Sequence, residues 1–245
     1  MEATDRKALI RRLAIASLAG QLVWFVGVSV AGLPEPGYSE LRDPVSSLGA
    51  GNAAHPWVFN LLVAIWGASF VAAAAALWLE GPGGWRGRLG PALIAFTGLA
   101  QILAGFPFPA DCRPTIEAWC EAQELSGDLS WRHYAHGWAY FLGSLSLLLS
   151  VFAMAWRFRG ERRWGAFAPL TLLAGLVAVA IVVGLFFVAG DNDAGEGSYG
   201  LAQRFALGAG GFWVAALAVG LLALRPGGGL GEENTQPTAR AARSA

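Results

Sequence analysis

Two histidines stand one helical turn apart in the segment WRHYAHGWAYFLGSLS, which is otherwise mostly apolar. A helix here would place four polar side chains within an arc of about 80°, because each residue is rotated by 100° from the last. They are His133, His136, Tyr140 and Ser144. A polar stripe on an apolar helix is costly unless it hydrogen-bonds to neighbouring helices or lines a wet cavity. We expect this stripe to face the interior of the protein.

Zinc binding is one chemistry that the stripe could carry. Two histidines at positions i and i+3 can present nitrogens to one metal ion, and Asp111, at the end of the preceding apolar segment, would be a third ligand. A water bound to the zinc would make such a site hydrolytic. The competing interpretation gives the histidines, including His55, roles as helix caps and hydrogen-bond partners. The sequence leaves both interpretations open.

A second group of polar residues lies in the segment GYSELRDPVSSLGAGNAAHP, between the first two apolar segments. Asp43 precedes a proline and, with Ser46 and Ser47, is typical of a turn or of the start of a short helix. The alternative is that these three side chains project into a cavity that opens outward.

The segments that must position these residues are long and apolar. Of the 245 residues, 14% are charged, against about 25% in a typical soluble domain. A bilayer core about 30 Å thick is crossed by roughly 20 apolar residues in a helix. Six segments have this length: Leu13 to Leu33, Trp57 to Leu79, Leu89 to about Phe108, Tyr134 to Trp156, Trp164 to Gly190 and Phe205 to Leu224. The sequence therefore predicts an all-α, polytopic membrane protein with a bundle of six transmembrane helices.

The distribution of charge predicts the orientation, because basic residues near the ends of spans stay on the cytoplasmic side. With alternating spans, the basic residues on the outer side are Arg42, Arg113, Arg132 and Arg204, and all others fall inside. Both termini are therefore expected in the cytoplasm. The bias toward Arg, Ala and Gly indicates a bacterium, and hence its inner membrane. A formal net charge of zero without a dense basic block excludes nucleic-acid binding.

These patterns divide the chain into three parts. We expect a cytoplasmic N-terminus (1–12), a membrane domain (13–224) with outer loops at about 34–56, 109–133 and 191–204, and a disordered cytoplasmic tail (225–245).

Arg204 begins the last apolar segment, beside Gln203, on the side of the membrane where arginine is disfavoured. Because a charge at the centre of a membrane helix costs about 2.5–3.5 kcal/mol, this guanidinium requires a partner or an escape to the interface. It could extend to the headgroups, pair with Asp43 or Asp111, or bind an anionic headgroup.

The two cysteines, Cys112 and Cys120, both lie in the outer loop that faces the oxidising side of the membrane. A disulfide is the natural interpretation, and closing so short a loop would contribute roughly 2–3 kcal/mol. Two free thiols are the alternative. The pair alone does not make a metal site, because the chain has no further cysteine.

Five short motifs follow one another along the chain: YSELRDPVSSLG, WVFN, FPAD, HYAH and GLAQR. In this order, over about residues 12–224, the chain resembles the prokaryotic membrane family described as domain of unknown function 998. The resemblance implies a six-helix fold with an outward polar cluster of Ser46, Ser47, Asp111, His133, His136, Gln203 and Arg204. The stretch between Asp111 and His133, which carries the cysteines, is longer than the family pattern.

Three functions fit these observations. The first is a non-enzymatic protein that binds a membrane lipid headgroup or a small solute in an outward pocket, with Asp43, Ser46, Ser47, Asp111, His133, His136, Gln203 and Arg204 as candidate residues. The second is a zinc-dependent intramembrane lipid hydrolase that holds its metal with Asp111, His133 and His136. The third is an accessory or assembly subunit whose glycine-rich last helices contact a membrane-protein partner or a second copy. The sequence does not decide whether the protein is an enzyme.

Overall fold

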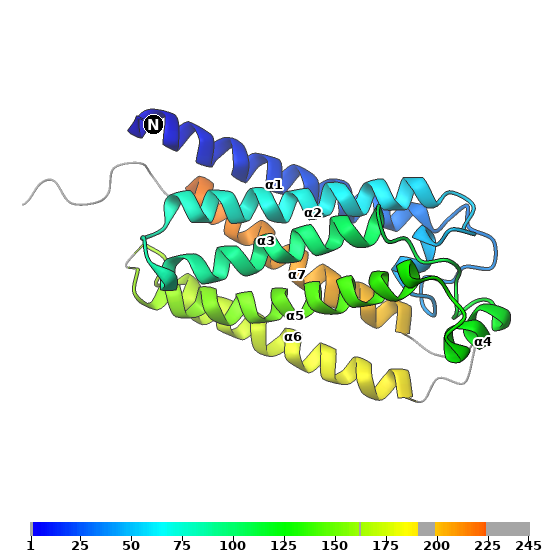
Figure 1. The fold of residues 1–245 in the computed structure, drawn as a ribbon. Helices are drawn as coiled ribbons and strands as arrows, with labels where there is room; N and C mark the ends of the chain where they lie inside the picture. Colours follow the sequence, from blue (N-terminus) through cyan, green and yellow to red (C-terminus); the bar gives the residue numbers. More distant parts are fainter. Residues whose placement is uncertain (1, 162, 191–198, 224–245) are drawn as a thin grey trace, which may run out of the picture.

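The computed structural model describes residues 2–161, 163–190 and 199–223, and within these ranges the regular structure is entirely helical. The helices are α1 (Ala3–Ala31), the 3₁₀-helix η1 (Val45–Gly49), α2 (Pro56–Glu80), α3 (Trp85–Gly105), α4 (Ala118–Ser126), α5 (Trp131–Arg159), α6 (Phe167–Gly190) and α7 (Tyr199–Ala223). Six long helices lie side by side along one axis, and the short α4 lies at the end of the molecule away from the N-terminus (Figure 1).

The long helices have the length and composition of membrane spans. Five of them, α1, α2, α3, α5 and α7, are apolar enough to cross a bilayer, and α6 is apolar over Phe167–Ile181. Large apolar side chains such as Leu22, Val26 and Leu99 are exposed on the outside of the bundle, where only lipid would cover them. The chain is a multi-pass helical membrane protein, as the sequence predicts.

The long helices pack side by side in a closed ring. Each long helix contacts the next long helix along the chain, α3 contacts α5 directly, and α7 returns to α1. Helices α5 and α7 are not among the closely packed pairs, although α6 contacts both. The contacts of α6 with α5 and α7, and of α7 with α1, are also less extensive than those that join α1, α2, α3 and α5.

Helices α2 and α3 lie close enough for their backbones to be in contact. A Cβ atom added to Gly67 would lie 2.5 Å from the carbonyl oxygen of Gly98, and one added to Gly98 would lie 2.4 Å from the carbonyl oxygen of Gly67. Small residues in this arrangement allow membrane helices to pack with their backbones in contact. This contact fixes α3, which forms one wall of the candidate site.

A buried ion-pair cluster joins α2, α3 and α5 at the end of the bundle near the N-terminus. The Arg157 side chain is almost fully buried and pairs with Glu80 at 3.0 Å and with Glu161 at 2.7 Å. It also donates hydrogen bonds to the carbonyl oxygens of Leu77 and Gly87. Because every part of the guanidinium is paired, burial of this charge is compatible with a stable fold.

The structure differs from the sequence-based expectation mainly at helix ends. Helix α1 begins at Ala3 rather than Leu13, and α7 at Tyr199 rather than Phe205, because a helix continues beyond its apolar part. Helix α4 was not predicted. It ends at Ser126, and Gly127, with a φ of 81°, is its left-handed C-terminal cap. The expected tail, 225–245, and most of the third outer loop lie outside the described residues.

Candidate functional site

A cavity of about 1250 Å³ lies where α5, α6 and α7 are loosely packed. Its lining on α5 runs from His133 to Val151, which corresponds to about 27 Å of helix at 1.5 Å per residue. Trp66 of α2 and Gln101 of α3 line it from the opposite side of the bundle. The cavity is therefore nearly as long as the hydrocarbon core of a bilayer, which is about 30 Å thick.

The end of the cavity near α4 is polar. The four residues of the stripe on α5, namely His133, His136, Tyr140 and Ser144, all line it. So do Ser46 and Ser47 of η1 and Gln203 of α7. Five of the eight candidate residues therefore meet at one cavity: Ser46, Ser47, His133, His136 and Gln203.

The other three candidates, Asp43, Asp111 and Arg204, are not part of the lining and instead hold the loops at the end of the bundle near α4. The Asp43 carboxylate is buried and accepts a hydrogen bond from the backbone N–H of Ser39 at 2.6 Å. The Asp111 carboxylate accepts hydrogen bonds from the backbone N–H and the hydroxyl of Ser130, at 2.7 and 2.8 Å, just before α5 begins. These contacts are typical of helix and loop capping.

Arg204 fastens the loop between α1 and η1 to α7. One guanidinium nitrogen donates to the carbonyl oxygens of Glu40 at 2.5 Å and of Asp43 at 3.4 Å, and the other donates to the Tyr38 hydroxyl. Arg204 therefore meets the backbone carbonyl of Asp43 rather than its carboxylate. Burial raises the pKa of the Tyr38 phenol above its usual value, although the Arg204 charge acts in the opposite direction.

The same loop also places η1 at the mouth of the cavity. The carbonyl oxygens of Leu41 and Arg42 accept hydrogen bonds from the first backbone N–H groups of α7, at 2.9 and 3.1 Å. The side-chain oxygen of Gln203 accepts a hydrogen bond from the backbone N–H of Val45 at 2.6 Å. The loop thus satisfies donors that the start of a helix leaves unpaired.

The two histidines of the stripe are held in opposite tautomers. The backbone N–H of Asp111 donates to Nδ1 of His133 at 3.2 Å, so this nitrogen is unprotonated, and Nε2 faces the Glu124 carboxylate at 3.5 Å. In His136, Nδ1 lies 2.9 Å from the carbonyl oxygen of Ala104 and 3.0 Å from that of Phe108. Carbonyl oxygens only accept, so Nδ1 of His136 carries the proton and Nε2 of the neutral ring is an acceptor.

The expected zinc ligands do not converge. Asp111 uses its carboxylate to cap α5, whereas His133 and His136 direct their bonded nitrogens to different backbone groups. In the part of the chain that the structure describes, no group of three or more His, Cys, Asp and Glu side chains is arranged to hold a metal ion.

A disulfide between Cys112 and Cys120 ties the loop after α3 to α4, as the sequence predicts. Arg113 then joins this loop to the loop after α1, since it pairs with Glu35 and, at 2.8 Å, with Glu117. Although partial burial opposes it, hydrogen bonds from Arg113 and Asn52 lower the pKa of Glu117 below its usual value. The loops at the end of the bundle near α4 are thus cross-linked to one another.

The deeper part of the cavity is apolar. Side chains of α5 and α6 dominate it, with Leu145 and Leu148 on one side and Leu170, Leu173 and Val177 on the other. Three polar residues that sequence reasoning did not single out also line the cavity: Trp66, Gln101 and Trp213. Gln101 was the most visible of these, because it is an uncharged polar residue within an apolar segment.

The polar atoms of these three residues are satisfied to different degrees. The indole N–H of Trp66 donates to the side-chain oxygen of Gln21 at 2.8 Å. By contrast, Oε1 of Gln101, Nε1 of Trp213 and Nε2 of His136 are buried without a hydrogen-bond partner among the described residues. Three residues with unmet hydrogen-bonding capacity therefore line one cavity.

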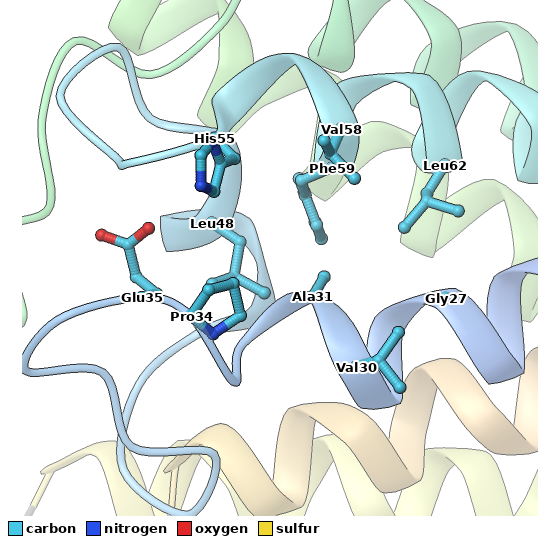
Figure 2. Close-up of a pocket in the computed structure, with 10 residues that line it drawn as sticks. All are labelled: Gly27, Val30, Ala31, Pro34, Glu35, Leu48, His55, Val58, Phe59 and Leu62. Carbon is cyan, nitrogen blue, oxygen red and sulfur yellow. The ribbon is translucent and has the colours of Figure 1, made fainter.

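A smaller cavity of about 250 Å³ lies between α1 and α2. Figure 2 shows Glu35 and His55 at one end and apolar side chains of both helices, including Phe59 and Leu62, along the rest. The Glu35 carboxylate is already used by Arg113 and by the backbone N–H of Ala54, the latter at 2.8 Å. The third histidine thus belongs to a different cavity from His133 and His136.

Comparison with known proteins gives one match. The sequence model of the family described as "Protein of unknown function (DUF998)" matches residues 18–220. Neither the curated proteins nor the solved structures contain a match to this chain.

Proposed function

Since the chain belongs to the DUF998 family, whose description assigns no activity, we propose from the geometry of the site that the protein binds an amphipathic membrane lipid in the cavity between α5, α6 and α7. The polar end of the lipid would lie at the mouth near η1 and α4, and its chain would lie along α5 and α6.

The observation that carries this proposal is the change in the lining from one end of the cavity to the other. Polar side chains gather within the first turns of α5, whereas leucine and valine side chains line the deeper part. A lipid has the same division between a polar head and an apolar chain. A small polar solute would leave the apolar part of the cavity without a matching group, and burial of apolar surface is the main source of affinity in such a site.

The cavity is also accessible from the bilayer. Leu145 of α5 and Leu170 and Leu173 of α6 line it and are among the large exposed apolar side chains, the last two with 62% and 58% of their surface exposed. These residues form an apolar rim at the height of the lipid chains. A lipid can therefore enter sideways, with its chain remaining in an apolar environment throughout.

The proposed function includes a topology. We propose that α6 is the sixth membrane span, that both termini are cytoplasmic and that the cavity mouth opens on the outer side of a bacterial cell membrane. Helix α6 has 24 residues, or about 36 Å, which is sufficient to cross a bilayer. The arginine distribution and the disulfide both support this orientation, because disulfides form on the oxidising side. The membrane domain would extend over 13–224.

Photo-cross-linking tests the proposal directly. The protein is reconstituted in vesicles with a monoacylglycerol that carries a diazirine in its acyl chain, irradiated, and digested for mass spectrometry. We expect adducts on Trp66 and Val151, which line the cavity and are buried from the surrounding bilayer. Adducts confined to the outer surface, at residues such as Leu22 and Val26, would contradict the proposal.

The topology is tested separately with single-cysteine variants placed at each end of α6 and labelled with an impermeant maleimide in intact cells. Labelling only at the end near Gly190 supports the orientation, and labelling only at the end near Phe167 contradicts it.

A further inference from the structure

The unmet hydrogen-bonding groups of the cavity define the chemistry of the ligand's head. The strongest of them is Nε2 of His136. Because two carbonyl oxygens fix the proton on Nδ1, the neutral ring offers Nε2 as an acceptor, and this atom is buried without a partner in the described chain. The His136 side chain itself is 8% exposed. A group that donates a hydrogen bond would meet this need.

Gln101 provides a second acceptor on the same wall. Its side chain is 2% exposed, and its Oε1 has no partner among the described atoms. It lies one turn before Ala104 on α3, and Ala104 is the residue whose carbonyl holds His136. Two residues that line the cavity, Gln101 of α3 and His136 of α5, therefore each have a buried acceptor that lacks a donor.

The charges around the cavity exclude an anionic head. Among the described lining residues there is no Lys or Arg, and the one ionisable acid is Glu124 at the mouth. From the sequence, Arg204 is a candidate partner for an anionic headgroup. In the structure its guanidinium is already hydrogen-bonded to the Tyr38 hydroxyl and to the carbonyl oxygen of Glu40. A phosphate or carboxylate placed here would find neutral donors, such as the indole N–H of Trp213, but no counter-charge, and an unpaired charge is strongly unfavourable in an apolar environment.

Resting on the proposed function, we infer that the ligand is an uncharged lipid alcohol, whose hydroxyl donates a hydrogen bond to Nε2 of His136 or Oε1 of Gln101. The hydroxyl is a donor that carries no charge, so it satisfies an acceptor without the desolvation cost of an ion. Its oxygen retains lone pairs that Ser46, Ser47 or a tyrosine hydroxyl can meet. The apolar chain continues into the leucine-lined depth.

Three matched competitors test the inference: octadecanol, octadecyl methyl ether and octadecyl phosphate. Each competes with the photoactivatable monoacylglycerol for cross-linking to Val151. We expect octadecanol to compete at concentrations about tenfold lower than either analogue, because a site with unpaired acceptors rejects a ligand that lacks the donor. Equal competition by the alcohol and the ether, or stronger competition by the phosphate, would overturn the lipid-alcohol assignment while leaving lipid binding in place. A failure of all three to compete would overturn the proposed function itself.

A variant assigns the effect to the acceptors. Gln101→Leu removes one unpaired acceptor and breaks no hydrogen bond between the described residues, so we expect a melting temperature at or above that of the parent protein and a smaller preference for the alcohol over the ether. Thr97→Val is the matched control, since Thr97 lies one turn away on α3, is fully buried, and has its hydroxyl paired with the carbonyl oxygen of Gly143 at 3.0 Å. An unchanged preference in Gln101→Leu together with an unchanged preference in His136→Phe would overturn the inference.

Discussion

Filling the cavity with a protein side chain should abolish lipid binding without harming the fold. Ala209 lines the cavity on α7, in the part where the lipid chain would lie. In Ala209→Phe, an aromatic ring would occupy the space of about four methylene groups of that chain. At about 0.8 kcal/mol for each buried methylene, the lipid would lose about 3 kcal/mol, or more than a hundredfold in Kd.

The matched control is Ala216→Phe. Ala216 lies on the same helix, is exposed on the bundle surface and is not part of the cavity lining, so the new ring would face lipid. The assay is a titration of cross-linking by the photoactivatable monoacylglycerol in nanodiscs, with melting temperatures measured for both variants. Binding by Ala209→Phe within about threefold of the parent protein, a difference of less than about 0.7 kcal/mol, at an unchanged melting temperature, would refute the assignment of the cavity as the lipid site.

The remaining predictions concern the structure around the site. Arg204→Gln should cost about 1.5–3 kcal/mol for each lost charged hydrogen bond, and limited proteolysis should then cleave the loop around Tyr38, which Arg204 holds. Gly98→Ala should lower the melting temperature because its Cβ would meet α2, whereas Gly208→Ala, with nothing within 4 Å, should maintain or raise it. The pKa of Glu117 is lowered in the fold, so the ionised carboxylate stabilises the folded protein fully above a pH of about 4.5, and this contribution is lost as the pH falls through the folded-state pKa. Glu117→Gln should therefore make the melting temperature less dependent on pH in the acid range. A chelator should leave the melting temperature unchanged, and a chelator-dependent fall with stoichiometric zinc would revive the hydrolase hypothesis.

The general architecture could be predicted because it depends on local composition. Runs such as those within α2 and α5 are long and apolar, and the bilayer allows few structures other than helices for them. The stripe from His133 to Ser144 could likewise be placed on one face from its spacing alone, and the structure puts all four of its polar residues at one cavity. The disulfide could be predicted because the chain has only two cysteines and both lie in one loop that was expected on the oxidising side of the membrane.

What could not be predicted depends on partners far away in the sequence. Arg204 was expected to meet a carboxylate or a headgroup, but it binds backbone carbonyls and a phenol more than 160 residues away. Backbone groups carry no sequence signal, so Asp111 was considered for the pocket or a metal site, and only for Asp43 did the sequence also indicate the turn in which its carboxylate is used. Trp213 had no polar neighbour in sequence to mark it as part of the site, and only the structure shows that α5, α6 and α7 enclose a cavity.

The most direct test of the account is an experimental structure of the protein in nanodiscs made with its native lipids. We expect an elongated density between α5, α6 and α7, with its polar end within hydrogen-bonding distance of Nε2 of His136 or Oε1 of Gln101. A structure in which α5 and α7 pack against each other and close the cavity, with those two atoms paired to protein groups, would contradict it.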